Sequence, residues 1–309
     1  MAGTDEREET FQKSLFTGSM DIEGMDALLA LYRDLYPERK TSLKPAGKHK
    51  DPDERETPMR LAEGFTMLEA PGILPGSVEL VEKAAEIGRI LSRYSEDQGS
   101  VNAAMNLVLA DPPSFLALAE IFLGDGEPSF REKLSSEEGA NPEVVMFVIF
   151  NATKGLFLQA ARRFAAVEVN QWEHGRCPVC GGEPAVAYLA GEGGKKFLIC
   201  HRCETHWRFP RLVCPFCEKK SPGESRYLYV EEPQYKTMTG QVCDECKRYI
   251  KTWRVEDDDL GDFHPEVEDL KTPGFDDALE SEGYCRGGAN VFGVLIGKGP
   301  GQEEGQEEG

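Results

Sequence analysis

The chain has 309 residues, of which 40% are hydrophobic, enough for one large domain or two smaller ones. Its formal net charge of −20 argues against a general nucleic-acid-binding protein, because contacts to phosphates need a positive field. The sequence has no run of about 18 uncharged apolar residues, and its acidic start lacks the apolar core of a secretory signal. We therefore expect neither a membrane span nor export.

The first 170 residues predict an all-helical bundle of five or six helices. Apolar residues recur through residues 13–36, with helical spacing in the second half of this range. Ser77 is expected to cap a helix that starts there, and Pro112 follows an aspartate at the start of another. Asn141 and the proline after it predict the beginning of a third helix, which could extend to about residue 169.

The pattern changes at His174, where turn residues, cysteines and short β-type runs replace the helical spacing. Short strands are predicted at residues 185–189, 196–199, 205–209, 226–230 and 249–253. An acidic stretch, a helix near residues 275–282 and a low-complexity tail at 301–309, expected to be disordered, follow them. Residues 170–253 contain 13 Lys or Arg and 10 Asp or Glu, so this segment is mildly basic within an acidic protein.

Eight of the nine cysteines form four Cys-x-x-Cys pairs, and each pair can supply half of a tetrahedral four-sulfur metal site. The pairs are Cys177/Cys180, Cys200/Cys203, Cys214/Cys217 and Cys243/Cys246. They are separated by 19, 10 and 25 residues, and the longer two gaps suit the hairpin of a zinc ribbon. We therefore assign the first two pairs to one metal ion and the last two to a second. A crossed arrangement, with the first pair joined to the third, stays open.

Metal binding is favoured over disulfides, because the chain carries no export signal, and over thioredoxin-like redox chemistry, because no βαβ frame surrounds a pair. Proline after Cys177 and Cys214 fixes the backbone of the turn, and Gly181 permits a positive φ. Four thiolates suit zinc, a single rubredoxin-type iron or, less often, an iron–sulfur cluster. The spacing does not separate iron from zinc.

Other candidates have simpler structural explanations. With eight cysteines closing two sites, His201 is expected to be a neighbour of the ligands, and Cys285 is expected to be a spare thiol. Three tryptophans are expected to pack within the small modules. A basic face could be formed by Arg202, Arg208, Arg211, Lys219 and Lys220, although a solvated surface is the simpler interpretation. No phosphate-binding loop, nucleophile elbow or metalloprotease motif is present, so no catalytic residue is predicted.

Residues 172–293 resemble the formate dehydrogenase accessory protein family, FdhE. Two strings carry the resemblance, Cys-x-x-Cys-Glu-Thr-x-Trp from Cys200 and Cys-Asp-x-Cys-Lys-x-Tyr-x-Lys from Cys243. The first knuckle, with Gly-Gly-Glu-Pro after Cys180, and Asn290-Val-Phe in the closing segment fit the same family. The N-terminal half shares with this family only the general order of helices before ribbons.

The resemblance implies a non-catalytic, iron-binding helper in the cytoplasm that acts on the catalytic subunit of a respiratory formate dehydrogenase. The predicted fold class is α+β, an N-terminal helical bundle followed by two rubredoxin-like or zinc-ribbon modules of short antiparallel strands. The predicted domains are residues 1–170, 171–212, 213–255 and a C-terminal segment, 256–309, with a helix and an acidic tail. Self-association stays open.

Two alternatives belong to other functional classes. The chain could be a soluble electron carrier with two rubredoxin-type irons. The paired four-cysteine sites are the feature that suggests this function. It could also be a zinc-ribbon nucleic-acid-binding protein, which the local positive balance permits but the total charge of −20 disfavours.

Overall fold

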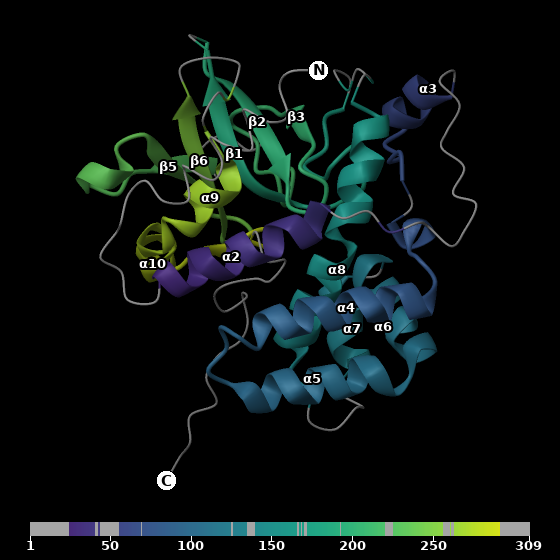
Figure 1. Cartoon of the computed structure of the whole chain (residues 1–309). Coiled ribbons are helices and arrows are strands. Elements are labelled where there is room, and N and C mark those ends of the chain that lie inside the picture. The colour runs from purple at the N-terminus through teal and green to yellow at the C-terminus, as the bar shows by residue number, and fades with distance from the viewer. Residues whose placement is uncertain are drawn as a thin grey trace, which may run out of the picture.

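A computed structural model describes residues 25–40, 43, 56–68, 70–124, 126–134, 140–165, 167, 169, 172–191, 193–219, 225–255, 260 and 263–290. The predicted α+β fold class is confirmed, with a helical part and a seven-stranded sheet lying side by side (Figure 1). The start of the expected first helical range, residues 13–24, and the tail expected to be disordered, residues 301–309, lie outside the described residues.

Seven α-helices precede the sheet in the described residues, against the five or six expected. Together with one 3₁₀ turn they are α2 (Met25–Lys40), α3 (Thr57–Ala62), η1 (Ala70–Ile73), α4 (Ser77–Leu91), α5 (Gln98–Ala110), α6 (Pro112–Gly124), α7 (Glu127–Leu134) and α8 (Pro142–Arg163). The spacing of apolar residues did not predict α3, α5 or α7. The start of α5 is nevertheless capped by the Asp97 carboxylate, which accepts a hydrogen bond from the Ser100 amide at 2.9 Å.

The predicted helix starts are close to the observed ones. The Asn141 side chain caps α8 by accepting from the Glu143 amide at 2.9 Å, as the Asn-Pro pair predicted. Ser77, expected to be a cap, is instead the first residue of α4, and Gly76 occupies the cap position. Helix α8 ends at Arg163, six residues before the expected end near residue 169.

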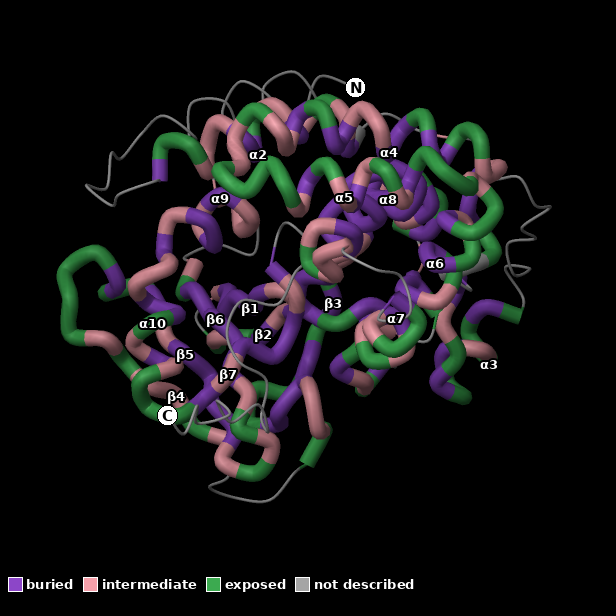
Figure 2. The backbone as a smooth tube through the Cα atoms, turned by 90° about the horizontal axis from the view of Figure 1, so that it is seen from below, coloured by how far each residue is buried: buried purple, intermediate pink, exposed green. Residues whose placement is uncertain are grey.

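Helix α8 is the central helix of the molecule. Its side chains are buried all the way from Val145 to Phe157, and Figure 2 shows it enclosed by the other helices. It has the length and hydropathy of a membrane span, but 78% of its most apolar window is buried inside the protein. Helices α5 and α6 reach the length and hydropathy of a membrane span only when they are taken as one segment, and that segment is bent by 111°. The burial of α8 is that of a core helix in a globular protein.

One sheet joins the two predicted hairpins. Its strands are β1 (Pro184–Ala190), β2 (Lys195–Cys200), β3 (His206–Arg208), β4 (Ser225–Leu228), β5 (Met238–Cys243), β6 (Arg248–Val255) and β7 (Cys285–Arg286). The strand order in the sheet is β3-β2-β1-β6-β5-β4. Strand β7 lies off this path and pairs with β6. Neighbouring strands within each hairpin are antiparallel, whereas β1 and β6 pair in parallel from Ala187↔Thr252 to Ala190↔Val255. The sequence analysis did not predict β5.

The two faces of the sheet have different cores. On one face, Val186, Tyr188 and Tyr249 pack against Phe275 and Leu279 of α10 (Pro273–Ser281). On the other face, Ala187, Leu198 and Ile250 join a larger core that continues through α8 and the remaining helices. This core also includes the end of α9 (Pro265–Leu270). The helical part and the sheet therefore fold around shared apolar residues.

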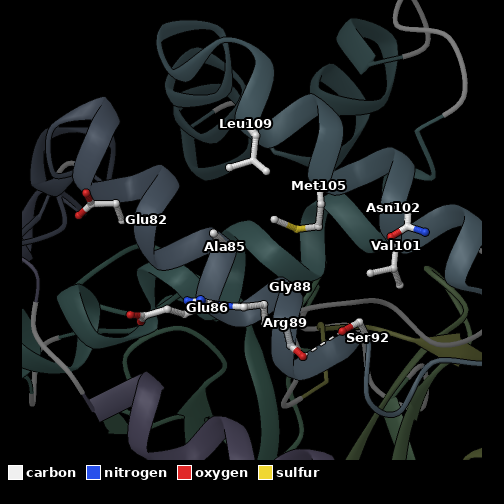
Figure 3. A pocket seen from close by; sticks show the side chains of 10 residues that line it. All are labelled: Glu82, Ala85, Glu86, Gly88, Arg89, Ser92, Val101, Asn102, Met105 and Leu109. Atoms are coloured by element: carbon white, nitrogen blue, oxygen red, sulfur yellow. Dashed lines mark hydrogen bonds between the residues drawn. The ribbon is translucent and has the colours of Figure 1, made fainter.

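An open cavity of about 540 Å³ lies between α4 and α5 (Figure 3). Met105 and Leu109 line it from α5, while Glu82 and Glu86 line it from α4. Gly88 brings the two helices close together, since a Cβ atom there would lie 2.1 Å from the Met105 sulfur. This cavity contains no cysteine and no histidine.

Candidate metal centres

Each Cys-x-x-Cys pair lies in a turn next to a strand. Cys177 and Cys180 precede β1, and Cys200 is the last residue of β2. The third pair follows β3, and Cys243 is the last residue of β5. The hairpins β1–β2 and β4–β5 therefore each bring two turns together at one end.

The first four cysteines form one group. The sulfurs of Cys177 and Cys203 lie 3.5 Å apart, and those of Cys180 and Cys200 lie 3.4 Å apart. All four side chains are buried. The Val179 amide donates to the Cys177 sulfur at 3.4 Å, and the Thr205 hydroxyl lies 3.0 Å from the Cys203 sulfur.

The last four cysteines form the second group. The sulfurs of Cys214 and Cys246 lie 3.7 Å apart, as do those of Cys217 and Cys243. Cys217 and Cys246 are half-buried, so this group lies closer to solvent than the first. The structure thus groups the sulfurs by hairpin rather than in the crossed arrangement.

Every knuckle ends in a left-handed residue directly after its second cysteine. Gly181 has φ +72°, and Glu204, Glu218 and Lys247 have φ of 56°, 54° and 55°. The turn lets the amide of Glu204 donate to the Cys200 carbonyl at 3.1 Å, and the amide of Glu218 donate to the Cys214 carbonyl at 3.0 Å. Positive φ is uncommon for residues other than glycine, so only Gly181 carried a sequence signal for it.

Both groups fit a tetrahedral metal ion. Four sulfurs at about 2.3 Å from one zinc ion would lie about 3.8 Å from one another. The measured neighbouring distances are 3.4–3.7 Å, and within each group all sulfurs lie within 4.8 Å. Gly182 leaves room for the first group, because a Cβ atom there would lie 3.1 Å from the Cys200 sulfur. The eight cysteines could therefore hold two metal ions.

Without a cation, the surroundings of several of these thiols oppose their ionisation. Burial and hydrogen bonds from the other thiols raise the pKa of Cys177, and a hydrogen bond from Cys246 together with burial raises the pKa of Cys214. Only ionised thiols bind metal, and a bound cation supplies the positive charge that keeps all four sulfurs of a group ionised. The assignment of the eight cysteines as metal ligands stays a prediction.

The helical part contacts the first group directly. The amides of Met67 and Leu68 donate to the carbonyls of Pro178 and Val179 at 3.0 and 2.8 Å. Arg202, between two of the cysteines, donates to the Leu123 carbonyl of α6 at 3.0 Å. The first knuckle is thus fixed to the segment between α3 and η1, and the second to α6.

Lys154 of α8 also links the helical part to the first cysteine group, and the sequence pattern did not predict this link. Its ammonium donates to the His201 carbonyl at 2.8 Å and lies 3.0 Å from Glu204 and 3.2 Å from Glu266 of α9. The Lys154 side chain is fully buried. Its signal in the sequence was a single lysine within an otherwise apolar helix, which in a buried helix requires a partner.

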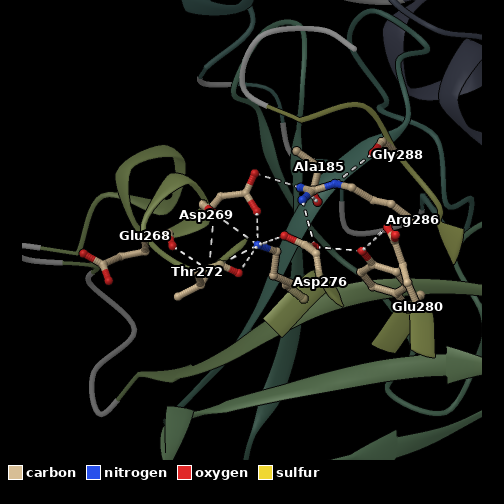
Figure 4. Close-up of polar contacts among 10 residues, drawn as sticks. Ala185, Glu268, Asp269, Thr272, Asp276, Glu280, Arg286 and Gly288 are labelled. Atoms are coloured by element: carbon tan, nitrogen blue, oxygen red, sulfur yellow. Dashed lines mark hydrogen bonds and ion pairs between the residues drawn. The ribbon is translucent and has the colours of Figure 1, made fainter. Parts of the chain in front are cut away.

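A second buried ionic cluster holds the C-terminal segment on the sheet (Figure 4). The Lys251 ammonium of β6 lies 3.0 Å from Asp269 and 2.5 Å from Asp276. The Arg286 guanidinium contacts the same two carboxylates at 2.8 and 3.3 Å. Two cations thus face two carboxylates, and the Tyr249 hydroxyl donates to Asp276 at 2.8 Å. This cluster fixes α9 and α10 relative to β6.

The histidines and tryptophans of this segment have structural partners. His201 stacks on Phe150 of α8 with ring centroids 5.7 Å apart, and burial lowers its pKa to about 4, so the ring is neutral. The ring of His206 lies 3.2 Å from the Tyr188 hydroxyl. The three tryptophans, Trp172, Trp207 and Trp253, are buried, as expected for packing within small modules.

Of the five residues that could form a basic face, the described ones divide between engaged and exposed side chains. Arg202 packs against the ring of Phe157, and Lys219 pairs with Glu245. Arg208 and Arg211 are exposed, and Lys220 lies outside the described residues. Cys285 lies on β7, where its thiol is 3.4 Å from the Lys247 carbonyl, and it belongs to neither cysteine group.

The sequence of the cysteine-rich segment matches known proteins. Residues 176–211 match the family described as FdhE, central domain, and residues 212–292 match FdhE, C-terminal domain. Protein FdhE of Escherichia coli K12 is 32% identical over 122 residues, which is 38% of this chain and 37% of that protein. Protein FdhE of Escherichia coli O9:H4 matches with the same identity and coverage. The match thus spans little more than a third of these relatives.

The fold matches over a longer range. The crystal structure of the FdhE protein from Pseudomonas aeruginosa superimposes with a TM-score of 0.58 over 93% of each chain, at 19% sequence identity. At this identity the likeness concerns the fold, and the sequence evidence comes from residues 176–292. The chain is thus similar to the FdhE central and C-terminal domains through residues 176–292, and its fold is similar to that of an FdhE protein over most of its length.

Proposed function

We propose that this protein is a non-catalytic, metal-binding accessory protein that assists the maturation of a respiratory formate dehydrogenase in the cytoplasm. Its client is the catalytic subunit of that enzyme, as the family resemblance implies. The observation that carries the proposal is the pair of four-cysteine groups, with eight sulfurs placed for two metal ions inside the segment that matches FdhE.

The geometry supports a helper rather than a metal enzyme. Four sulfurs complete the coordination of a tetrahedral ion and leave no open position for substrate, which is the arrangement of structural sites. Metal binding would be coupled to folding of the hairpins, because the apparent binding free energy of such sites is of the order of 10–16 kcal/mol. We propose that the two ions, iron or zinc, stabilise a surface that binds the client.

Co-purification with the catalytic subunit of formate dehydrogenase tests this function. We expect the wild-type chain and the Cys285→Ser variant to retain the subunit, because Cys285 belongs to neither four-cysteine group. We expect Cys243→Ser to lose it, because the second group would no longer be complete.

Two results together would contradict the proposal. One is that no formate dehydrogenase subunit is retained by the wild-type chain. The other is normal formate dehydrogenase activity in a strain that lacks the protein.

A soluble electron carrier is a second candidate, for which the partial exposure of Cys217 and Cys246 is the specific observation. Electron transfer needs a redox-active iron near the surface, whereas zinc has no redox chemistry. The absorption spectrum and metal content of protein purified without oxygen separate the two. Colourless protein that contains two zinc ions per chain and stays colourless on exposure to air would exclude the carrier.

We propose no nucleic-acid partner. The net charge is −20, and two residues of the expected basic face, Arg202 and Lys219, are engaged within the protein. Retention on DNA or RNA that weakens with salt would contradict this part of the proposal.

A further inference from the structure

A cavity of about 490 Å³ lies beside the turn of the β1–β2 hairpin, and no cysteine is among the residues that line it. Its walls include Trp172, the glycines of the hairpin turn and the segment Arg208–Arg211 that leaves β3. Small-molecule sites have volumes of roughly 300–1,000 Å³, so the cavity has the size of a ligand site.

Basic side chains line most of this cavity. Among the described residues, Lys195, Lys196, Arg208 and Arg211 line it together with one carboxylate, that of Glu173. Arg208 and Arg211 are exposed, and neither guanidinium forms an ion pair with any residue that the structure describes. A concave surface that carries two such arginines raises the local concentration of anions.

Lys196 differs from the other buried lysines of the described chain. Lys83, Lys154 and Lys251 each contact a carboxylate. The ammonium of Lys196 donates instead to the amide oxygen of Gln241 and lies 5.2 Å from the centre of the Phe209 ring.

Among the residues that the structure describes, the Lys196 ammonium forms no ion pair with a carboxylate. A buried charge without a counter-ion is costly. An anion in the adjoining cavity would reduce that cost.

The hairpin turn leaves space next to the guanidinium groups. A Cβ atom at Gly193 would meet no atom within 4 Å, and one at Gly194 would lie 3.0 Å from Nη1 of Arg211. Gly194 has φ +55°, a conformation that favours glycine. The two glycines therefore keep the backbone of the turn open toward Arg211.

We propose that this cavity binds a small phosphate-bearing anion. Arg208 and Arg211 both line the cavity, and the paired N–H donors of a guanidinium match phosphate oxygens through charge-assisted hydrogen bonds. A hollow of this size favours a small molecule over an acidic protein segment, which needs a longer groove. The site would be additional to the metal centres and does not depend on the proposed client.

Titration calorimetry with inorganic pyrophosphate on the full-length, metal-loaded protein at low ionic strength tests the proposal. We expect the wild-type chain to bind with a dissociation constant below about 1 mM. The double variant Arg208→Gln/Arg211→Gln should bind at least about tenfold more weakly, because two charge-assisted contacts are lost. Arg162→Gln, an exposed arginine at the end of α8, serves as the matched control and should bind like wild type.

Circular dichroism and metal content confirm that the variants are folded, so that a lost contact is not mistaken for unfolding. The proposal is overturned if pyrophosphate produces no binding heat at millimolar concentration, or if the double variant binds as tightly as wild type. It is also overturned if a glutamate-rich peptide binds more tightly than pyrophosphate, which would assign the surface to a protein partner.

Discussion

Lys154 joins the helical part of the protein to the first cysteine group through a single ammonium. Replacing it by methionine keeps the length of the side chain but leaves Glu204 without its cation. Loss of one partner from a fully buried pair costs about 3–5 kcal/mol. Because both carboxylates reach solvent in part, we expect Lys154→Met to lower the free energy of unfolding by about 2–3 kcal/mol.

Urea unfolding of the metal-loaded protein measures this loss. Lys236→Met is the matched control, since Lys236 is exposed and its replacement should change stability by less than about 0.5 kcal/mol. Equal losses in the two variants would show that the buried contacts of Lys154 contribute nothing beyond those of a surface lysine.

The cysteines provide a second test at the residue scale. Cys177→Ser and Cys243→Ser should each release one metal ion and lower the melting temperature by at least about 10 °C, because metal-coupled folding of a hairpin is lost. Cys285→Ser should retain both ions and the wild-type melting temperature, since its thiol belongs to neither cysteine group and lies 3.4 Å from the Lys247 carbonyl. Melting curves and metal analysis of the three variants decide this. The assignment of the ligands is wrong if all three melt alike.

At the scale of elements, spacing in the sequence predicted what depends on local chemistry. The Asn-Pro start of α8 is an example, because the cap and the proline act within one turn. The grouping of the cysteines follows from hairpin lengths in the same way. Strand β5 was missed because its sequence, Met238–Cys243, mixes polar residues and a glycine, and it becomes a strand by pairing with β4 and β6.

The left-handed residues after the second, third and fourth knuckles also could not be predicted. Glu204, Glu218 and Lys247 have no intrinsic preference for positive φ, and the turn around the sulfurs imposes it. The partners of Lys154 come from three separate segments, which local patterns cannot bring together. The sequence therefore predicted which cysteines gather into two groups but not what fixes these groups to the helical part.

Packing of α10 on the sheet depends on a glycine in β5. A Cβ atom at Gly240 would lie 2.5 Å from a methyl carbon of Leu279, which is buried in α10. We expect Gly240→Ala to reduce the free energy of unfolding by about 1–3 kcal/mol through overpacking. Gly193→Ala is the control, because a Cβ atom there has nothing within 4 Å. If denaturant titration shows no difference between the two variants, α10 is not held against β5 as described.

The acid stability of the contact between α9 and α8 follows from Glu266. Burial alone would raise the pKa of Glu266, but Lys154 and Arg39 outweigh it and lower the value to about 2. In the unfolded chain the pKa is near 4.5. A lowered pKa stabilises the fold above pH 4.5, by up to roughly 3 kcal/mol, and this contribution is lost as the pH falls toward 2.

Comparison of wild type with Glu266→Gln isolates this effect, because acid also removes metal from both proteins. We expect the difference in free energy of unfolding to be constant above about pH 5 and to shrink steadily toward pH 3. Thermal melts at a series of pH values measure it. A difference that does not change with pH would mean that Glu266 titrates normally in the folded protein.

For the molecule as a whole, the parallel pairing of β1 with β6 is the central feature. It joins the hairpins that carry the two cysteine groups into one sheet, although more than fifty residues separate these strands in the chain. Gly175, just before the first knuckle, contacts the third knuckle, because a Cβ atom there would lie 1.7 Å from the Pro215 carbonyl oxygen. The predicted division into modules at 171–212 and 213–255 stays a prediction, and the sheet crosses it.

This continuity predicts that the two metal centres stabilise each other. Cys243→Ser removes a sulfur of the second group at the end of β5 and should loosen β6, which pairs with β1. We therefore expect faster amide hydrogen exchange not only in β5 and β6 but also in β1 and β2, whose own four cysteines are untouched. Exchange in α4 and α6, which are remote from the second group, should change least (Figure 1).

Hydrogen exchange followed by mass spectrometry distinguishes cooperative from independent modules, with Cys285→Ser as the control. If Lys195–Cys200 keeps wild-type protection in Cys243→Ser while β5 and β6 lose theirs, the hairpins open separately and the β1–β6 pairing contributes little. If protection from exchange falls in both hairpins and added metal restores it in neither, the two cysteine groups are coupled through the pairing of β1 with β6. An effector that reached one group would then change the surface presented by the other, because one sheet carries both.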